Sequence, residues 1–282
     1  MEPSTETVHT PARIAIKPRR MSFRFDSRTP RYWYAGDPVV THLLNVLSHS
    51  FPDGERFFVD SVRHYKDRVE EPTRKAEIQG FVGQEAMHTV AHERFNQYLS
   101  TQDYADILAD AEAMAGKLLR GARLRLTPRE QLAATVGLEH ATALLADAIL
   151  GHEERIAAFD PAVRTLWTWH CLEELEHKAV AFDLHEHVGG SHTERKVLLL
   201  GATFFLVAWS VWYTGRMLER DGMLRRPLVI ARGLYRLLGP GGLVSGQIPA
   251  FFDFLADDFH PWKHQNQHLL ERYADEAVRM PS

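Results

Sequence analysis

The short motif Glu-x-x-His occurs twice in this 282-residue chain, at Glu85–His88 and at Glu174–His177. Both copies lie in stretches that read as helices, where residues three apart project from the same side. Each copy therefore aims a carboxylate oxygen and an imidazole nitrogen at one point, and both groups are common metal ligands. One copy arises by chance in helices rich in Glu and His, so it is the repetition that indicates a metal site.

A single glutamate precedes each motif on the helical run before it. Glu55 belongs to the apolar face of its run, and Glu139 stands where the run from Pro128 would be expected to carry an apolar residue. The order Glu, Glu-x-x-His, Glu, Glu-x-x-His is the ligand plan of ferritin-like di-iron and di-manganese carboxylate proteins. Two simpler interpretations stay open. Glu55, near Pro52 and Gly54, favours the helix dipole, and Glu139 is a surface residue.

Four inward carboxylates in one core need a counter-charge. An ionised carboxylate that is buried without a partner costs much free energy, and four together would repel each other and take up protons. Two divalent cations would neutralise four carboxylates. Mixed carboxylate and imidazole ligands suit iron and manganese, and also zinc. We therefore expect two iron ions, with manganese or zinc as alternatives.

The segment HCLEELEHK, residues 170–178, carries the densest set of these groups. At about 100° per residue, His170, Glu174 and His177 lie together on the apolar side of a helix. Glu173 and Glu176 point elsewhere and are either solvated or support the ligands. The segment thus mixes an inward coordinating face with a second charged face.

Several other polar residues have simpler explanations. His92, one turn after His88, is a core or ligand-supporting histidine, or else it faces the site. Cys171 is the sole cysteine, which excludes an intrachain disulfide and fits a reducing compartment, and we expect a small core residue there. Two further clusters are expected to be structural or at the surface: Asp183, His185, Glu186 and His187, and Asp257, Asp258, His260 and His264. If residues 257–264 folded over the bundle, they would instead cap the site.

The elements that must position these residues are helical, since strand-like alternation is absent over any useful length. The sequence predicts helical runs at 39–51, 55–69, 74–100, 103–125, 128–151 and 161–188. We predict an all-α, ferritin-like four-helix bundle with additional C-terminal helices. Its parts would be a flexible N-terminal arm at 1–36, the four-helix di-metal bundle at 37–190 and a C-terminal helical extension at 191–282.

An apolar run, VLLLGATFFLVAWSVWYTG at 197–215, contains no charged residue. It is about as long as the roughly 20 residues that a bilayer core needs, and Trp209, Trp212 and Tyr213 gather at one end, as at a membrane interface. Two interpretations remain: a buried core helix, or a helix that contacts a membrane. The nearby Arg225, Arg226 and Arg232 would then meet lipid head groups, or else form a solvated face.

Composition limits the class of protein. The chain is 45% apolar and 25% charged, with a net charge of −4, so nothing suggests a nucleic-acid binder. The N-terminus has no apolar core of signal-peptide length. We expect a cytoplasmic protein, or one associated with a membrane, and a homodimer is an option.

Four segments resemble a known family: FPDGERFF, FVGQEAMHTVAH, WHCLEELEHKAVAFD and FHPW. They are similar to the ferritin-like family labelled predicted metal-dependent hydrolases, over about residues 15 to 265. The resemblance implies a helical metal-binding fold and, from the label, hydrolysis.

A second resemblance lies in ligand order. His170 adds a histidine one turn before the second motif, as in di-iron proteins of the aminobenzoate N-oxygenase type. That resemblance implies a ligand set of Glu55, Glu85, His88, Glu139, His170, Glu174 and His177. Alternatively, His170 does not bind metal itself and instead forms a hydrogen bond that holds one of the carboxylate ligands in place.

Three functions follow from such a site. The first is an O₂-dependent di-iron oxygenase or oxidase that takes electrons from a donor and acts on a small or lipophilic organic substrate. The second is a metal-dependent hydrolase, as the family label says. The third is a non-catalytic iron-binding protein.

Overall fold

The computed structural model describes residues 14–279, and within this range the regular secondary structure is helical. No strand forms there; Tyr34 and Phe159 make an isolated β-bridge. The all-α prediction is confirmed. The helices are α1 (Pro38–Arg63), α2 (Pro72–Leu99), α3 (Ala105–Arg125), α4 (Pro128–Leu150), α5 (Glu153–Ala157), α6 (Pro161–His177), α7 (Val180–His187), α8 (His192–Arg220), α9 (Pro227–Leu238), α10 (Ile248–Asp253) and α11 (Gln267–Arg279).

Local sequence explains where the long helices begin. Proline is the first residue of α1, α2, α4 and α6, a position where its missing N–H has no intrahelical role. The preceding side chain caps the free N–H groups: Asp37 accepts from the first turn of α1, and Thr127 forms a capping box with Glu130 at α4. Ser191 and Glu194 form the same box at α8.

The expected break at residues 52–54 is wrong, because α1 runs through Pro52 without stopping. A proline inside a helix leaves the carbonyl four residues earlier without its N–H donor. Here that carbonyl belongs to Ser48, and the side-chain amide of Asn96 on α2 donates to it at 3.1 Å. A remote residue thus satisfies the hydrogen bond that Pro52 removes.

The predicted run 161–188 is instead two helices, α6 and α7, separated by Lys178 and Ala179. Ala179 has φ −100° and ψ −12°, about 30–40° from the values of a regular α-helix. The Lys178 ammonium donates to the His264 carbonyl at 2.9 Å and to Asn266 Oδ1 at 2.8 Å, which ties this turn to the C-terminal segment. The break carries neither Gly nor Pro, and the apolar periodicity continues across it. The sequence therefore does not indicate where α6 ends.

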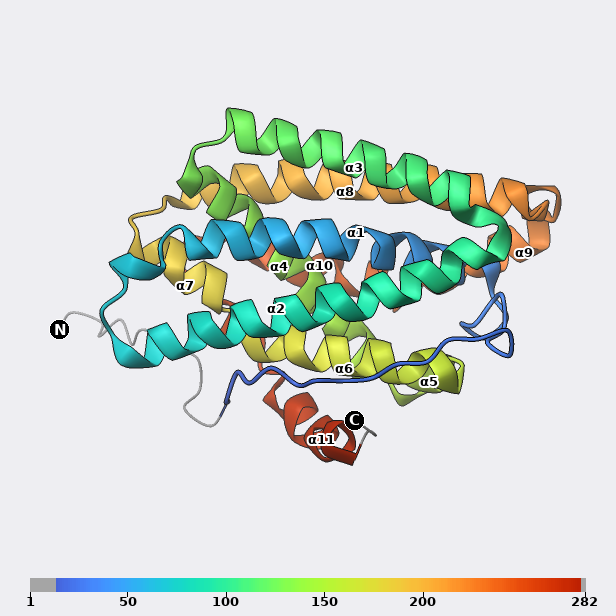
Figure 1. The fold of residues 1–282 in the computed structure, drawn as a ribbon, viewed down its shortest axis with the longest axis horizontal. Helices are drawn as coiled ribbons and strands as arrows, with labels where there is room; N and C mark the ends of the chain where they lie inside the picture. Colours follow the sequence, from blue (N-terminus) through green and yellow to red (C-terminus); the bar gives the residue numbers. More distant parts are fainter. Residues whose placement is uncertain (1–13, 280–282) are drawn as a thin grey trace.

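Figure 1 shows α1 lengthwise through the middle of the molecule, with α2 and α6 below it and α3 and α8 above. α2 runs antiparallel to α1. α3 then returns along the length of the molecule, so that α2 and α4 start from the same end. This return is what lets four helices separated in sequence, α1, α2, α4 and α6, surround one interior.

The interior contains two apolar clusters with a polar layer between them. Along α2, Phe81 belongs to one cluster and Phe95 to the other, and Glu85 lies between. Along α4, Val136 and Ala143 likewise belong to different clusters, on either side of Glu139. α1 repeats the arrangement around Glu55, and α6 does so together with α7, since Leu172 and Ala181 belong to different clusters. The polar residues of the four helices therefore meet at one level.

Residues 14–36 contain no helix and run along α2 and α6 (Figure 1). Two glycines of α2 allow this close approach. A Cβ at Gly80 would lie 2.3 Å from the Ile16 carbonyl oxygen, and one at Gly83 would lie 2.3 Å from Pro18 Cγ. The division of the chain at residues 36 and 190 stays a prediction, and residues 1–13 lie outside the described range.

By length and composition alone, α4 and α8 are each long and apolar enough to cross a membrane, which is weak evidence by itself. Their surroundings differ. Of the most apolar window of each helix, 72% is buried in α4 but only 28% in α8. α4 is therefore a core helix, whereas much of the apolar run 197–215 faces outward.

Candidate metal centre

The structure brings all seven predicted donor residues into the polar layer. Each is at most 3% exposed. Glu55 comes from α1, Glu139 from α4, the first Glu-x-x-His motif from α2, and His170 with the second motif from α6. As metal ligands they stay a prediction; their burial excludes the surface alternative for Glu139.

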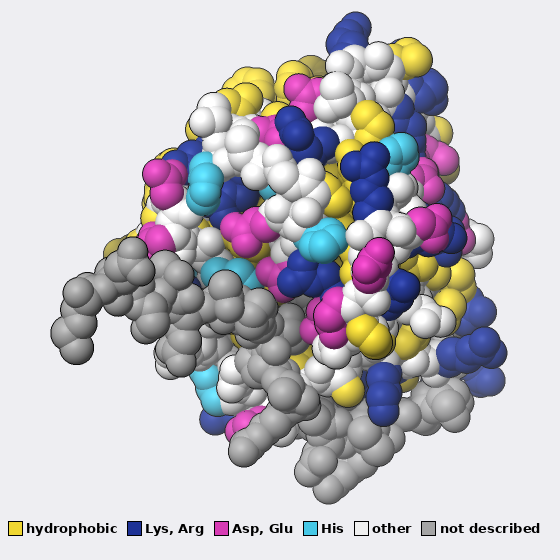
Figure 2. Space-filling model, turned by 90° about the vertical axis from the view of Figure 1, so that its left-hand side faces the viewer, with side chains coloured by type: hydrophobic (Ala, Val, Ile, Leu, Met, Phe, Trp, Pro, Cys, Tyr) yellow, Lys and Arg dark blue, Asp and Glu magenta, His cyan; other side chains and the backbone are white. Residues whose placement is uncertain are grey.

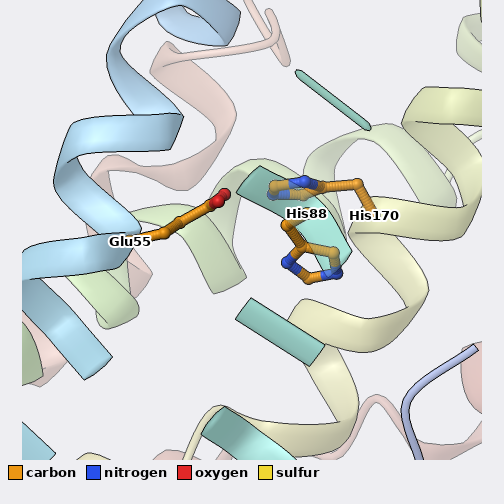
Figure 3. A group of neighbouring side chains, drawn as sticks. All are labelled: Glu55, His88 and His170. Atoms are coloured by element: carbon orange, nitrogen blue, oxygen red, sulfur yellow. The ribbon is translucent and has the colours of Figure 1, made fainter. Parts of the chain in front are cut away.

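Donor atoms gather in three overlapping groups, within each of which they lie no more than 4.8 Å apart. Figure 3 shows one group, in which Glu55 points across the interior toward the rings of His88 and His170. The three groups share members, so they form a continuous set rather than separate sites: Glu55, His88 and His170; Glu85, His88 and Glu174; Glu85, Glu139 and His177.

Three carboxylates from three helices surround the Nε2 atom of His177. Glu85 Oε1 lies 3.0 Å away, Glu139 Oε2 3.3 Å and Glu174 Oε1 3.7 Å. Despite these distances, His177 Nε2 and both carboxylate oxygens of Glu85 and of Glu139 have no hydrogen bond of acceptable geometry among the described residues. Buried polar atoms are rarely left without partners. Potential metal-ligand atoms that converge without forming hydrogen bonds to one another are the arrangement expected around a cation.

The pKa values of the clustered glutamates reflect how closely the carboxylates are gathered in a buried layer. Burial, and then the neighbouring carboxylates, raise the pKa values of Glu55 and Glu85 well above the ordinary range. Burial and the charge of Glu174 raise the pKa of Glu139 to about 7. Without cations, these carboxylates therefore retain protons at a pH where exposed glutamates are ionised.

Glu174 and His177 form the charged pair within this set. Burial opposes ionisation of Glu174, but His177 and His170 outweigh it and lower the pKa of Glu174. Burial likewise opposes a charge on His177, but Glu139 and Glu174 raise its pKa. One imidazolium thus takes the place that a metal cation would fill.

One nitrogen of each histidine is held from outside, so that the other nitrogen faces the carboxylates. His88 Nε2 lies 3.1 Å from Glu173 Oε2, and His177 Nδ1 lies 3.0 Å from Gln84 Oε1. His170 Nδ1 lies 2.9 Å from His92 Nε2. Metal-binding histidines are commonly oriented through their second nitrogen in this way.

A second layer of charge supports this orientation. Glu173 and Glu176 are buried, so the interpretation of them as solvated residues is wrong and the supporting role fits. The Arg19 guanidinium donates to Glu173 Oε1 at 3.0 Å and to Glu176 Oε2 at 2.9 Å. Gln84 donates to the same Glu176 oxygen at 2.7 Å. The N-terminal segment thereby supplies the cation that two buried carboxylates require.

Sequence reasoning missed Arg19, Gln84, Ser48 and Thr89. Ser48 Oγ lies 2.7 Å from His92 Nδ1, and Thr89 donates to Glu55 Oε2 at 3.0 Å. Thr89 follows His88 in the sequence and Gln84 precedes Glu85, and this proximity to predicted ligands could have identified both residues as candidates. Arg19 lies in a stretch without periodicity and offered none.

The two histidine-rich clusters outside the centre are structural or at the surface. His260 Nε2 lies 2.9 Å from Asp183 Oδ1, and this buried pair ties the C-terminal segment to α7. Asp257 and Asp258 are exposed and pair with Lys196 and Lys263.

Comparison with known proteins gives one positive result. No curated protein and no solved structure matches the chain. A family profile with the description "Predicted metal-dependent hydrolase" matches residues 17–265, which include all seven donor residues and Arg19. The chain therefore belongs to the family of predicted metal-dependent hydrolases.

Proposed function

We propose that α1, α2, α4 and α6 form a ferritin-like four-helix bundle that holds two metal ions. The return of α3 along the molecule supports this arrangement, because it gives the helices the directions of a bundle with one long crossover. The observation that carries the proposal is the set of buried Glu85, Glu139 and His177 atoms that converge without hydrogen bonds.

The donor groups suggest how two cations would be shared. Glu55, His88 and His170 would hold one, and Glu85, Glu139 and His177 the other. Glu174 lies between, since its Oε1 is 3.2 Å from His170 Nε2 and 3.7 Å from His177 Nε2. Carboxylate and imidazole donors together suit iron, manganese or zinc.

We propose metal-dependent hydrolysis as the activity, in keeping with the family description. Bound metal ions would polarise the bond to be cleaved and acidify a water molecule. The protein would supply the carboxylates and imidazoles that hold the ions, and Glu173, Gln84 and His92 would keep the imidazoles in position.

O₂-dependent oxidation is a second candidate, favoured by the enclosure of the site. The Phe51 ring stacks on His170 at 4.7 Å between centroids, Phe81 meets His177 at 4.9 Å, and the seven donors are almost fully buried. A small apolar molecule such as O₂ enters such an interior more easily than a hydrated substrate. This function would require two iron ions, an electron donor and a small or lipophilic organic substrate.

Metal content of the whole protein tests the centre. Protein purified anaerobically from iron-replete cells should hold two metal ions per chain, and Glu85→Ala or Glu174→Ala should remove them. Glu186→Ala, an exposed glutamate on α7, is the matched control. Unchanged metal content in both ligand variants would overturn the proposed centre.

Activity then separates the two functions. Zinc- or manganese-loaded protein that cleaves esters, amides or phosphoesters without O₂ supports hydrolysis. Oxidation would be the function instead if the iron-loaded, reduced protein consumes O₂ in proportion to its metal content and cleaves none of these substrates with any metal. Metal binding with neither activity would leave the iron-binding role.

A further inference from the structure

The exposed hydrophobic surface is concentrated in one part of the chain. Among the side chains that the structure describes, all the large hydrophobic residues that are exposed lie between Val197 and Phe252, except Val90, Met114, Leu118 and Leu124. This stretch covers α8, α9 and α10. By contrast, Figure 2 shows acidic, basic and histidine side chains interspersed over another face of the molecule, with hydrophobic side chains gathered at its upper-left edge.

α8 has two apolar faces, of which only one is used by the fold. Its inner face is held by Leu199 and Met217, which are fully buried, and by Trp209, whose indole N–H donates to the Ala111 carbonyl of α3 at 3.3 Å. The outer residues recur every three or four positions and include no charge: Val197, Leu200, Phe204, Val207 and Val211. Phe204 is 67% exposed. Soluble monomers seldom expose a continuous apolar face of this length.

α9, which follows α8 in the chain and also packs on α1, repeats the pattern. Gly233 and Leu237 are buried, and a Cβ at Gly233 would lie 2.4 Å from Val39 Cβ, so α9 packs closely on α1. Its outer face carries Leu228, which is 84% exposed, and Tyr235, which is 67% exposed. A helix held this firmly against the protein presents its apolar stripe to the outside in a fixed position.

Unpaired arginines lie next to these apolar faces. Arg225, Arg226 and Arg232 are exposed, and their side chains make no hydrogen bond or ion pair within the described part of the chain. The basic residues of α8 differ, since Arg216 pairs with Asp110 and Arg220 with Asp106. Within residues 197–252, the unpaired positive charge therefore lies in the turn after α8 and on α9.

The charge of this surface argues against a second copy of the chain as its partner. Between Val197 and Phe252 the only acidic residues are Glu219 and Asp221. Asp221 is already bound by Tyr32, His42, Tyr104 and Arg31. A two-fold contact joins the same surface patch on both copies, so it would bring the arginines together with almost no acid to receive them. Anionic phosphate head groups would receive all three.

We propose that the outer faces of α8 and α9 dock on the surface of an anionic phospholipid bilayer, with the arginines at the level of the head groups. α8 would lie along the membrane and would not cross it, because Trp209 and Tyr213 bond its inner face to α3. Amphipathic helices bind membranes in this way through apolar burial together with attraction to anionic lipid.

Vesicle co-sedimentation of the full-length protein tests the proposal, and it needs no metal in the site, so its failure is separate from that of the proposed function. The protein should bind vesicles of phosphatidylcholine with phosphatidylserine more tightly than vesicles of phosphatidylcholine alone, and salt should weaken binding. Arg225→Ala/Arg226→Ala/Arg232→Ala should reduce affinity for the anionic vesicles by roughly a hundredfold, from about fivefold per arginine. The matched control, Lys75→Ala/Arg94→Ala/Lys117→Ala, removes three exposed cations elsewhere and should change little.

Phe204→Ser/Val211→Ser tests the apolar face, and both residues are exposed enough for the fold to tolerate the change. This variant should lose vesicle binding with an unchanged unfolding midpoint. Failure of the natural protein to bind anionic vesicles would overturn the proposal. So would a dimer in sedimentation that this variant dissociates while vesicle binding persists, because a second copy would then occupy the surface.

Discussion

Replacing Glu139 with glutamine is expected to stabilise the metal-free protein at alkaline pH. The pKa of this carboxyl is about 7 in the fold against an ordinary 4.5, so its ionisation costs about 3 kcal/mol more in the folded than in the unfolded chain. The folded state binds the extra proton, and stability is therefore lost as the pH rises from about 4.5 to above about 7. Glutamine cannot ionise, and this loss should disappear.

Urea unfolding of chelator-treated protein measures the effect. At about pH 8 the Glu139→Gln protein should be more stable than the natural one by up to about 3 kcal/mol, and at about pH 4 the two should agree closely. With metal bound the order should reverse, because a ligand has been lost. The exposed Glu186→Gln is the control. If Glu139→Gln brings no gain at alkaline pH, burial and the charge of Glu174 do not raise the pKa of Glu139 as described.

Two further predictions concern the supports of the site. Arg19→Met should lower the free energy of unfolding by urea by about 2 kcal/mol, which is below the usual value for breaking a buried ion pair because Arg19 is a quarter exposed. Adding Glu176→Gln should recover part of this loss. No recovery would mean that Arg19 acts through packing. Asn96→Ala should cost about 1–2 kcal/mol, because it leaves the Ser48 carbonyl without a donor. In a Pro52→Ala protein the same change should cost less, since position 52 regains an N–H; an equal cost in both backgrounds would contradict this account of α1.

The burial of the seven predicted ligands in one layer could be predicted from the sequence, because helix geometry relates the spacing of residues to the direction in which they point. Glu85 and His88, or Glu174 and His177, must face the same side of any regular helix, and the apolar residues around them show which side is inward. Burial of these residues at one level then follows from packing the apolar faces. The direction of a side chain within its own helix does not depend on how the helices are connected.

Features that depend on contacts remote in sequence could not be predicted. Where α1 continues through Pro52, Asn96 of α2 donates to the carbonyl that the proline leaves without a partner, and α6 ends where Lys178 meets the C-terminal segment. The position of α8 was open for another reason. A run without charged residues has no polar side, so its sequence does not say how much of it faces outward.

The contact of Arg19 with Glu173 also bears on the order in which the protein folds. The two residues are 154 positions apart, and closing so large a loop is entropically costly and slow compared with forming local helices. The helices around the polar layer can therefore assemble first, with the side next to Glu173 and Glu176 still open to solvent. A cation would enter most easily at that stage, and the N-terminal segment would then close over the loaded interior.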